Sequence, residues 1–329
     1  MPVLTTNYIP PRIFKSADAA TIYASKFRKV SLKASKMERL ELPDGDFLDL
    51  AWNYSKNGTA QNAVILLHGL AGNASRPYMQ GMAKKFTSES FDAIAMNFRG
   101  CSDEPNRKYQ SYHAGATEDL SEVITHVLKT EKYSNIVLAG FSLGGNMVLK
   151  YLGEDRERPA QIKAGIAISV PCDLEGSLGA INRMRNFIYS KRFEVSLKEQ
   201  LFARALDYPE AIDKKSIQAC NSLRDIDDLY TSKAHGFKDA SDYYTKNSSL
   251  QFLPHIKIPV LILNAKNDSF LSEKCYPISI AENSENIYLE MPDYGGHVGF
   301  VTRFPTYYHE KRAFEFAAER LEFPSNSTS

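Results

Sequence analysis

The feature that most constrains the fold is an alternation of short apolar runs with helix-like segments between residues 63 and 170. The apolar runs are continuous, which is typical of strands buried on both faces of a parallel sheet. The segments between them carry apolar residues at helical spacing. This alternation predicts a doubly wound α/β fold. The expected strands are Ala63–Leu67, Ala93–Met96, Asn135–Ala139 and Ala164–Ile168, and the expected helices are Tyr78–Thr87 and Thr117–Lys129.

Elements of other kinds precede and follow this region. Residues 37–42 and 47–52 alternate apolar and polar side chains around the turn residues Pro43–Asp46, which predicts an antiparallel hairpin. A short helix is expected before it, around residues 19–29. Near the C-terminus we expect strands at 258–263 and 287–291, a helix between them ending near residue 282, a final helix over 307–321 and a disordered tail from residue 323.

The strand pattern stops between residues 173 and 255. This stretch has no convincing buried strand and is rich in large aromatic side chains, so helices and loops are expected. A connection this long inside a compact domain is usually a functional insertion. We therefore expect one domain over residues 1–329, with residues 173–255 forming a helical cap whose aromatic side chains mostly make the cap's own core.

Ser142 is the candidate nucleophile. It lies in a Gly-x-Ser-x-Gly pentad, Gly140–Gly144, between an expected strand and residues that can form a helix. In a strand–turn–helix of this kind, strained backbone angles hold the serine hydroxyl clear of the sheet. The pentad also arises by chance in glycine-rich turns, so the prediction depends on what the rest of the chain supplies.

A serine hydroxyl needs a base to accept its proton and an acid to orient that base. Such groups are expected in the chain order serine, acid, histidine, each following a strand. Asp268 follows the strand ending at residue 263 and is the expected acid. Asp173, after an earlier strand, is the main alternative; Asp293 is expected on the wrong side of its strand end, and Asp268 also suits a helix N-cap.

The expected base is His297. The chain has seven histidines, but only His297 follows both the last expected strand and a glycine pair, which suits a tight and mobile loop. The other six have weaker contexts: His126 falls within a helix, His235, His255 and His309 lie in or beside surface-like segments, His113 has no comparable context, and His68 is expected to brace its loop.

A serine nucleophile also needs hydrogen-bond donors for the oxyanion that forms during acyl transfer. One expected donor is the backbone N–H of Leu143, which follows the serine at the start of a helix. The other is the backbone N–H of Leu70, in the loop after the strand Ala63–Leu67. Arg99, at another strand end, either binds an anionic substrate group or, more commonly for such an arginine, orders neighbouring loops.

The amino-acid composition excludes only functions that require a large net charge. Forty Lys and Arg against 39 Asp and Glu give a formal net charge of +1, so no nucleic-acid partner is expected. The four cysteines are scattered, without metal-type spacing, which favours free thiols and a cytoplasmic location over two disulfides. Neither a signal peptide nor a membrane-spanning segment is expected, and no metal or organic cofactor is required.

Several motifs together resemble the α/β-hydrolase superfamily and, more narrowly, AB-hydrolase family 4, the YheT-like group that includes medium-chain fatty-acyl ester synthase/esterases. The resemblance implies an α/β-hydrolase fold, the triad Ser142, Asp268 and His297, and hydrolysis of carboxylic esters. It fixes no substrate. The motifs are Asp44–Phe47 with Trp52, His68–Gly72, Asn97–Cys101, Gly140–Asn146, Gly236–Phe237 with Asp242–Tyr244, Asn267–Asp268 and Gly295–Phe300.

From these residues we expect a serine carboxylesterase that acts on short- to medium-chain acyl esters through an acyl-enzyme. An acyltransferase using the same residues is the nearest alternative, distinguished by whether an added alcohol yields ester instead of acid. A non-catalytic binding protein of the same fold is the other alternative and predicts a broken triad. Sequence leaves the oligomeric state open.

Overall fold

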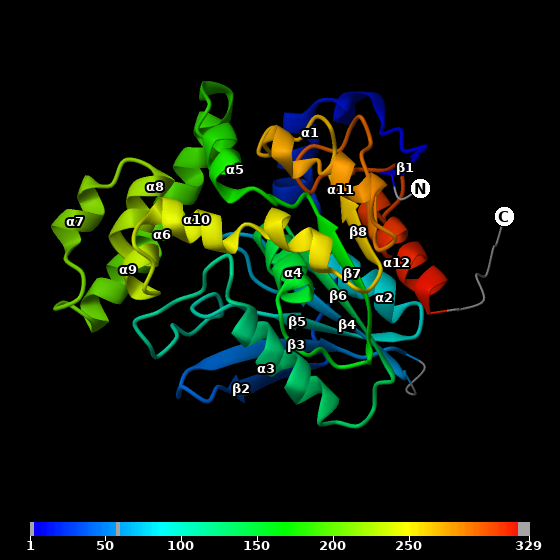
Figure 1. Ribbon diagram of the computed structural model, residues 1–329, viewed down its shortest axis with the longest axis horizontal. Coiled ribbons are helices and arrows are strands. Elements are labelled where there is room, and N and C mark those ends of the chain that lie inside the picture. The colour runs from blue at the N-terminus through cyan, green and yellow to red at the C-terminus, as the bar shows by residue number, and fades with distance from the viewer. Residues whose placement is uncertain (1–2, 57–59, 322–329) are drawn as a thin grey trace.

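The computed structural model describes residues 3–56 and 60–321, which form a sheet of nine strands with helices on both faces (Figure 1). The strand order is β1-β9-β8-β7-β6-β4-β5-β3-β2. This arrangement confirms the predicted α/β-hydrolase fold with a mostly parallel sheet. The strands are β1 (Val3–Leu4), β2 (Lys36–Glu41), β3 (Phe47–Asn53), β4 (Asn62–Leu67), β5 (Phe91–Met96), β6 (Asn135–Phe141), β7 (Ile162–Ile168), β8 (Val260–Leu263) and β9 (Ile287–Glu290).

Strand pairing confirms the predicted N-terminal hairpin. Strands β2 and β3 pair antiparallel, and β3 joins the sheet antiparallel to β5, while β4 to β9 pair in parallel. Strand β1, in which Val3 lies opposite Leu289 at the sheet edge, was not predicted from the sequence. Two residues are too few for a periodic pattern to be visible. The parallel strands carry the candidate residues on loops at one shared edge of the sheet.

Helices cover the two faces of the sheet, and the strands alternate their side chains between two buried clusters. In β4, Ile65 and Leu67 face the side covered by α3 and α4, whereas Val64 and Leu66 face the side covered by α2 and α12. Such strands are apolar throughout because both faces are buried. The flanking helices are α2 (Pro77–Thr87), α3 (Thr117–Leu128), α4 (Leu143–Gly153), α11 (Ile278–Glu282) and α12 (Tyr308–Arg320).

Residues 174–255 form helices and contain no strand, as the sequence predicts. In Figure 1 the middle of this stretch extends to the left of the sheet, whereas residues 249–255 lie against α4. A small core of their own includes Leu201, Ile217 and Tyr230. The helices are α5 (Leu174–Ile181), α6 (Phe187–Asp207), α7 (Lys214–Ala219), α8 (Leu223–Ile226), α9 (Ser232–Ala234) and α10 (Ala240–Asn247), followed by a 3-10 helix, Ser249–His255.

Several element boundaries differ from the predicted ones. The N-terminal helix α1 (Ala17–Ile22) begins earlier than expected and continues as a π-helical turn, Tyr23–Phe27. Strand β8 begins only after Pro259, which has no N–H to donate to a neighbouring strand. The predicted disordered tail lies outside the described residues. Among the described helices, none is both long and apolar enough to cross a membrane.

Candidate active site

Ser142 occupies a sharp turn between β6 and α4. Its backbone has φ 51° and ψ −120°, a region that non-glycine residues rarely adopt. The flanking glycines are required by close backbone contacts: a Cβ on Gly140 would lie 2.2 Å from the Gly144 carbonyl oxygen, and one on Gly144 would lie 2.5 Å from the Leu67 carbonyl oxygen. The pentad therefore forms the strained strand–turn–helix that its sequence predicts.

The structure brings Ser142, His297 and Asp268 together from three separate loops. His297 Nε2 lies 3.0 Å from Ser142 Oγ, and His297 Nδ1 lies 2.8 Å from Asp268 Oδ2. With Nδ1–H donating to the carboxylate, Nε2 is left as an acceptor for the serine hydroxyl. Asp268 is buried, and its other oxygen accepts the Phe270 N–H at 2.9 Å. This chain of hydrogen bonds can pass a proton from serine to histidine.

The two rival carboxylates have other partners. Asp173 Oδ1 accepts the Gly176 N–H at the start of α5, and its Oδ2 accepts the Ser272 hydroxyl at 3.0 Å. Asp293 is exposed and pairs with Lys266 at 2.8 Å. Asp173 is therefore the N-cap of α5, whereas Asp268 caps no described helix and faces His297.

Three side chains hold the loop that carries His297, and sequence reasoning identified none of them for this role. Thr21 Oγ1 accepts the His297 N–H at 2.9 Å, and Ser169 Oγ accepts the Val298 N–H at 2.9 Å. Asn267 Oδ1 accepts the Gly296 N–H at 2.9 Å. These bonds tie the loop to residues far from it in the sequence, so the loop is tight, as expected. Of the three, only Asn267 belongs to a motif noted in the sequence, the one that it forms with Asp268.

The N-terminal helix approaches this loop closely enough to exclude side chains. Gly296 has φ +57°, and a Cβ there would lie 2.5 Å from the carbonyl oxygen of Ala17 in α1. The Phe270 ring stacks on the His297 ring with centroids 4.4 Å apart. The imidazole is therefore fixed by its own backbone, by a ring face and by the Asp268 carboxylate.

The two expected oxyanion donors lie beside Ser142. Leu70 and Leu143 line a cavity with Ser142 and His297, and no acceptor for either N–H is present among the described residues. The Leu70 loop is held by two tyrosines: Tyr78 accepts the Gly69 N–H, and Tyr112 accepts the Ala71 N–H at 2.9 Å. Two N–H groups without protein acceptors beside a serine suit an oxyanion.

His68 braces this loop, as predicted. Its Nδ1–H donates to the Gly69 carbonyl at 2.8 Å, and its Nε2 accepts the Phe98 N–H at 3.1 Å. Burial lowers the pKa of His68 to about 4. The ring is therefore neutral at physiological pH, with both nitrogens engaged in backbone contacts.

The prediction for His309 is wrong. It was expected in or beside a surface-like segment, but it is fully buried on α12, with its ring 5.7 Å from that of Phe141. Burial holds the pKa of His309 well below its ordinary value. Helix α12 contains many charged residues, so its one buried face is not evident from the sequence. His113 and His235 pack together, with ring centroids 4.4 Å apart.

Arg99 orders neighbouring loops, which is the more common role considered for it. Its guanidinium donates to Asp119 at 2.7 and 2.8 Å and to Asp44 at 2.6 Å, and it reaches Asp46 at 3.2 Å. These acidic partners already neutralise its charge. Among the described residues, no group of three or more His, Cys, Asp or Glu side chains is arranged to hold a metal ion. The four cysteines are free and buried.

Two cavities are lined by the candidate nucleophile, and a third borders the residues beside it. An apolar one of about 150 Å³ contains Ser142 and His297, and its walls include Leu178, Leu223 and Phe270. A second, of about 160 Å³, contains Ser142 and His297 and lies between α1 and α6. A third, of about 400 Å³, shares Leu70 and Leu143 with the first.

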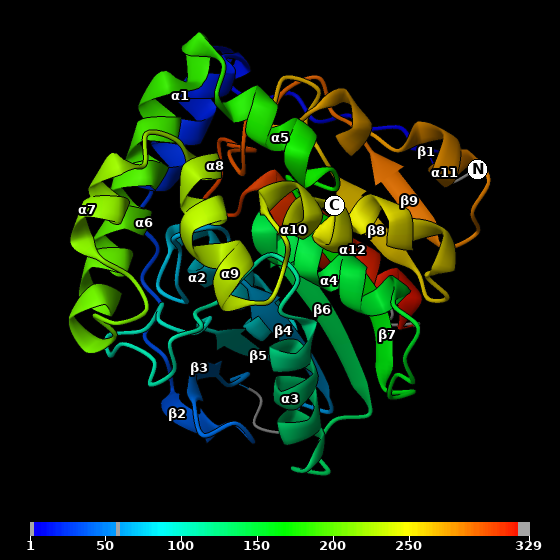
Figure 2. The ribbon, with the colours of Figure 1, turned by 60° about the vertical axis from the view of Figure 1, so that its left-hand side comes forward.

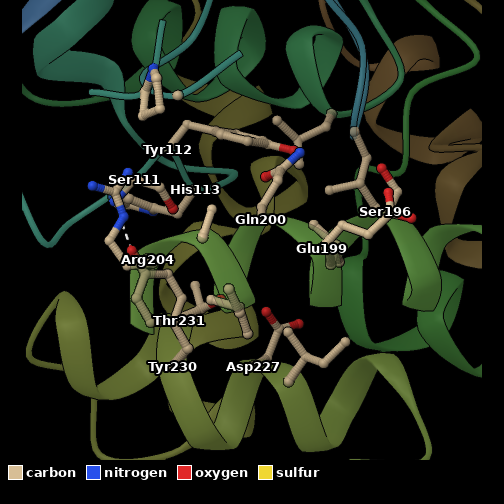
Figure 3. Close-up of a pocket in the computed structure, with 18 of the residues that line it drawn as sticks. Ser111, Tyr112, His113, Ser196, Glu199, Gln200, Arg204, Asp227, Tyr230 and Thr231 are labelled. Atoms are coloured by element: carbon tan, nitrogen blue, oxygen red, sulfur yellow. Dashed lines mark hydrogen bonds between the residues drawn. The ribbon is translucent and has the colours of Figure 1, made fainter. Parts of the chain in front are cut away.

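The walls of the third cavity carry more polar groups than those of the first (Figure 3). Tyr112, His113, Gln200 and Asp227 lie around it. Burial raises the pKa of Asp227 to about 6. The first and third cavities therefore both border Leu70 and Leu143, which carry the two free N–H groups.

Comparison with known proteins gives one family. A family model described as the alpha/beta hydrolase fold matches residues 62–304. The chain is 32% identical to the putative esterase YheT of Escherichia coli over 302 residues, covering 90% of this chain and 88% of that protein. It is 27% identical to the phospholipase ABHD3 of Bos taurus, covering 91% of this chain and 74% of that protein.

Solved structures show the same fold. An esterase of Pyrococcus furiosus superposes with a TM-score of 0.61 at 18% identity, covering 89% of this chain and 96% of that one. Est1E of Butyrivibrio proteoclasticus superposes with a TM-score of 0.57 at 14% identity, covering 88% of this chain and 100% of that one.

Proposed function

Because the chain belongs to the alpha/beta hydrolase family, we propose that it is a serine hydrolase that cleaves carboxylic esters of short to medium acyl chains through an acyl-enzyme. The observation that carries the proposal is the pair of hydrogen bonds linking Ser142 Oγ to His297 at 3.0 Å and His297 to Asp268 at 2.8 Å. The esterase and phospholipase names of its relatives support an ester as the bond that is cleaved.

In the proposed mechanism His297 Nε2 accepts the hydroxyl proton of Ser142 as Oγ attacks the ester carbonyl carbon. The carbonyl oxygen becomes negative and accepts the N–H groups of Leu70 and Leu143. Asp268 keeps the proton of His297 on Nδ1 and stabilises the imidazolium. Protonated His297 then gives its proton to the departing alcohol, and water repeats the sequence on the acyl-enzyme to release the acid and free Ser142.

Helices α5 to α10 act as a cap over this site in the proposed function. The apolar cavity accommodates the acyl chain, and its limited volume of about 150 Å³ supports a short or medium chain. Phe193 from α6 and Leu223 from α8 form part of its wall. The other cap aromatics do not mostly pack within the cap, contrary to expectation: Tyr230 does, but Phe237, Tyr243 and Tyr244 pack in or against the main core of the sheet.

A fluorophosphonate probe tests the proposal directly. We expect the probe to form one covalent adduct, located by peptide mass spectrometry on Ser142, because among the described residues only this serine hydroxyl lies within hydrogen-bond distance of a histidine. The same preparation is expected to hydrolyse p-nitrophenyl esters, fastest for short to medium acyl chains. A folded protein that remains unlabelled would sink the serine-hydrolase assignment, and a rate that rises steadily toward long chains would sink the chain-length assignment.

Thr21 is expected to be a positioning residue for His297. Thr21→Val removes the acceptor of the His297 N–H, and we expect kcat to fall about tenfold with KM little changed. Thr21→Ser keeps the hydroxyl and is expected to restore most of kcat. Normal kcat in Thr21→Val together with a loss in Thr21→Ser would mean that packing of the threonine methyl group, and not the hydrogen bond, supports activity.

A further inference from the structure

Two segments far apart in the sequence, residues 12–29 and residues 183–195, form one exposed surface that we call the rim surface. The segments contact each other through Asp18, which accepts the Tyr189 hydroxyl at 3.1 Å and lies 3.8 Å from the Arg185 guanidinium. Figure 2 shows α1 beside the first half of α6. The rim surface therefore joins the N-terminal helix to the proposed cap.

The rim surface carries large apolar side chains that project into solvent. Ile188 is 79% exposed, Phe27 is 65% exposed and Met184 is 87% exposed. Patches of exposed apolar side chains commonly mark a binding surface. The complete set is Ile13, Ile22, Tyr23, Phe27, Met184, Phe187, Ile188 and Val195.

The polar residues of the rim surface are predominantly basic. Its two acidic residues are already paired, Asp18 with Arg185 and Glu194 with Lys191 and Lys198. The basic residues outnumber them, so the surface has a net positive charge although the whole chain is nearly neutral. The exposed basic residues are Arg12, Lys15, Lys26, Lys29, Arg183, Arg185, Lys191 and Arg192.

The rim surface also borders the way to the nucleophile. The cavity between α1 and α6 is lined by Thr21 and Ser25 from the first segment, by Arg192 from the second, and by Ser142 and His297 at its base. A partner bound to the rim surface therefore lies at the mouth of this cavity. A molecule leaving that partner could reach Ser142 without crossing bulk water.

We propose that the rim surface docks on an anionic lipid surface. Apolar side chains surrounded by basic ones are the combination that binds such a surface, by burial at the interface and by attraction to acidic headgroups. A second copy of the chain is disfavoured as the occupant because two positively charged surfaces would face each other. The docking does not depend on the proposed function. Only the further idea that the lipid layer supplies the ester rests on it.

Vesicle cosedimentation tests the docking, with Ser142→Ala protein used so that no lipid is hydrolysed. We expect binding to phosphatidylcholine vesicles containing about one third phosphatidylglycerol, weaker binding as salt rises, and little binding to phosphatidylcholine alone. The double variant Phe27→Ser with Ile188→Ser is expected to lower vesicle affinity about tenfold or more. The matched control, Met37→Ser with Leu206→Ser, alters residues 60% and 67% exposed elsewhere and is expected to bind normally.

Three outcomes would overturn the proposal: no binding to anionic vesicles, equal binding by the rim and control variants, or a dimer in sedimentation velocity that only the rim variant abolishes. The last would make the rim surface an interface between copies. Hydrolysis of a dissolved short ester by the rim variant, with Ser142 restored, separates the two proposals. Activity there is expected to equal that of the unmodified protein, so loss of docking is distinguishable from failure of the esterase assignment.

Discussion

Ser142→Ala is expected to lower kcat for ester hydrolysis by about 10⁴-fold or more and to abolish fluorophosphonate labelling. The change removes the only atom that can form the acyl-enzyme in the proposed mechanism. It leaves the turn intact, because alanine keeps the Cβ of serine and the same backbone strain at φ 51°. The measurement is kcat for a p-nitrophenyl ester, with circular dichroism and the thermal midpoint showing that the variant is folded.

The residual rate of this variant is informative. The oxyanion donors Leu70 and Leu143 and the cavities remain, so a small rate above that of buffer is compatible with the mechanism. A folded variant that retains a substantial part of the activity would contradict the role of Ser142. If the unmodified protein lacks activity and labelling as well, the non-catalytic alternative becomes the better explanation.

Asp268→Asn is expected to lower kcat by about 10⁴-fold. The amide is close in volume to the carboxylate, so packing around the buried side chain is retained. However, its Nδ2 would donate to His297 Nδ1 where the carboxylate accepts from it at 2.8 Å. The proton would then sit on Nε2, facing Ser142, and the ring could no longer accept the hydroxyl proton. The measurement is kcat from steady-state kinetics.

Asp173→Asn is the matched control for this second prediction. Asparagine caps a helix about as well as aspartate, so the bond from the Gly176 N–H survives and kcat is expected to stay within a few-fold of normal. The reverse pattern, collapse with Asp173→Asn and near-normal activity with Asp268→Asn, would transfer the role of the acid to Asp173.

Much of the fold was predictable because its strands are buried on both faces. A run such as Ala63–Leu67 has to be apolar throughout to lie between two layers of helices, and that requirement is visible in the sequence. Strand β1 was not predictable, because a two-residue edge strand is defined by its partner β9 alone. His309 was misplaced for a related reason, since only the packing of α12 determines which of its faces is buried.

The sequence by itself determined the strained turn at Ser142 and the chain order of the three candidate residues. Both depend on local properties: glycines where backbones nearly touch, and loops that follow buried strands. Only the tertiary structure shows that Asp268, and not Asp173, lies beside His297, that Thr21 and Ser169 bind the His297 loop, and that α1 contacts α6. Such contacts join residues far apart in the chain, so they leave no periodic or local pattern and exist only once the sheet has brought the segments together.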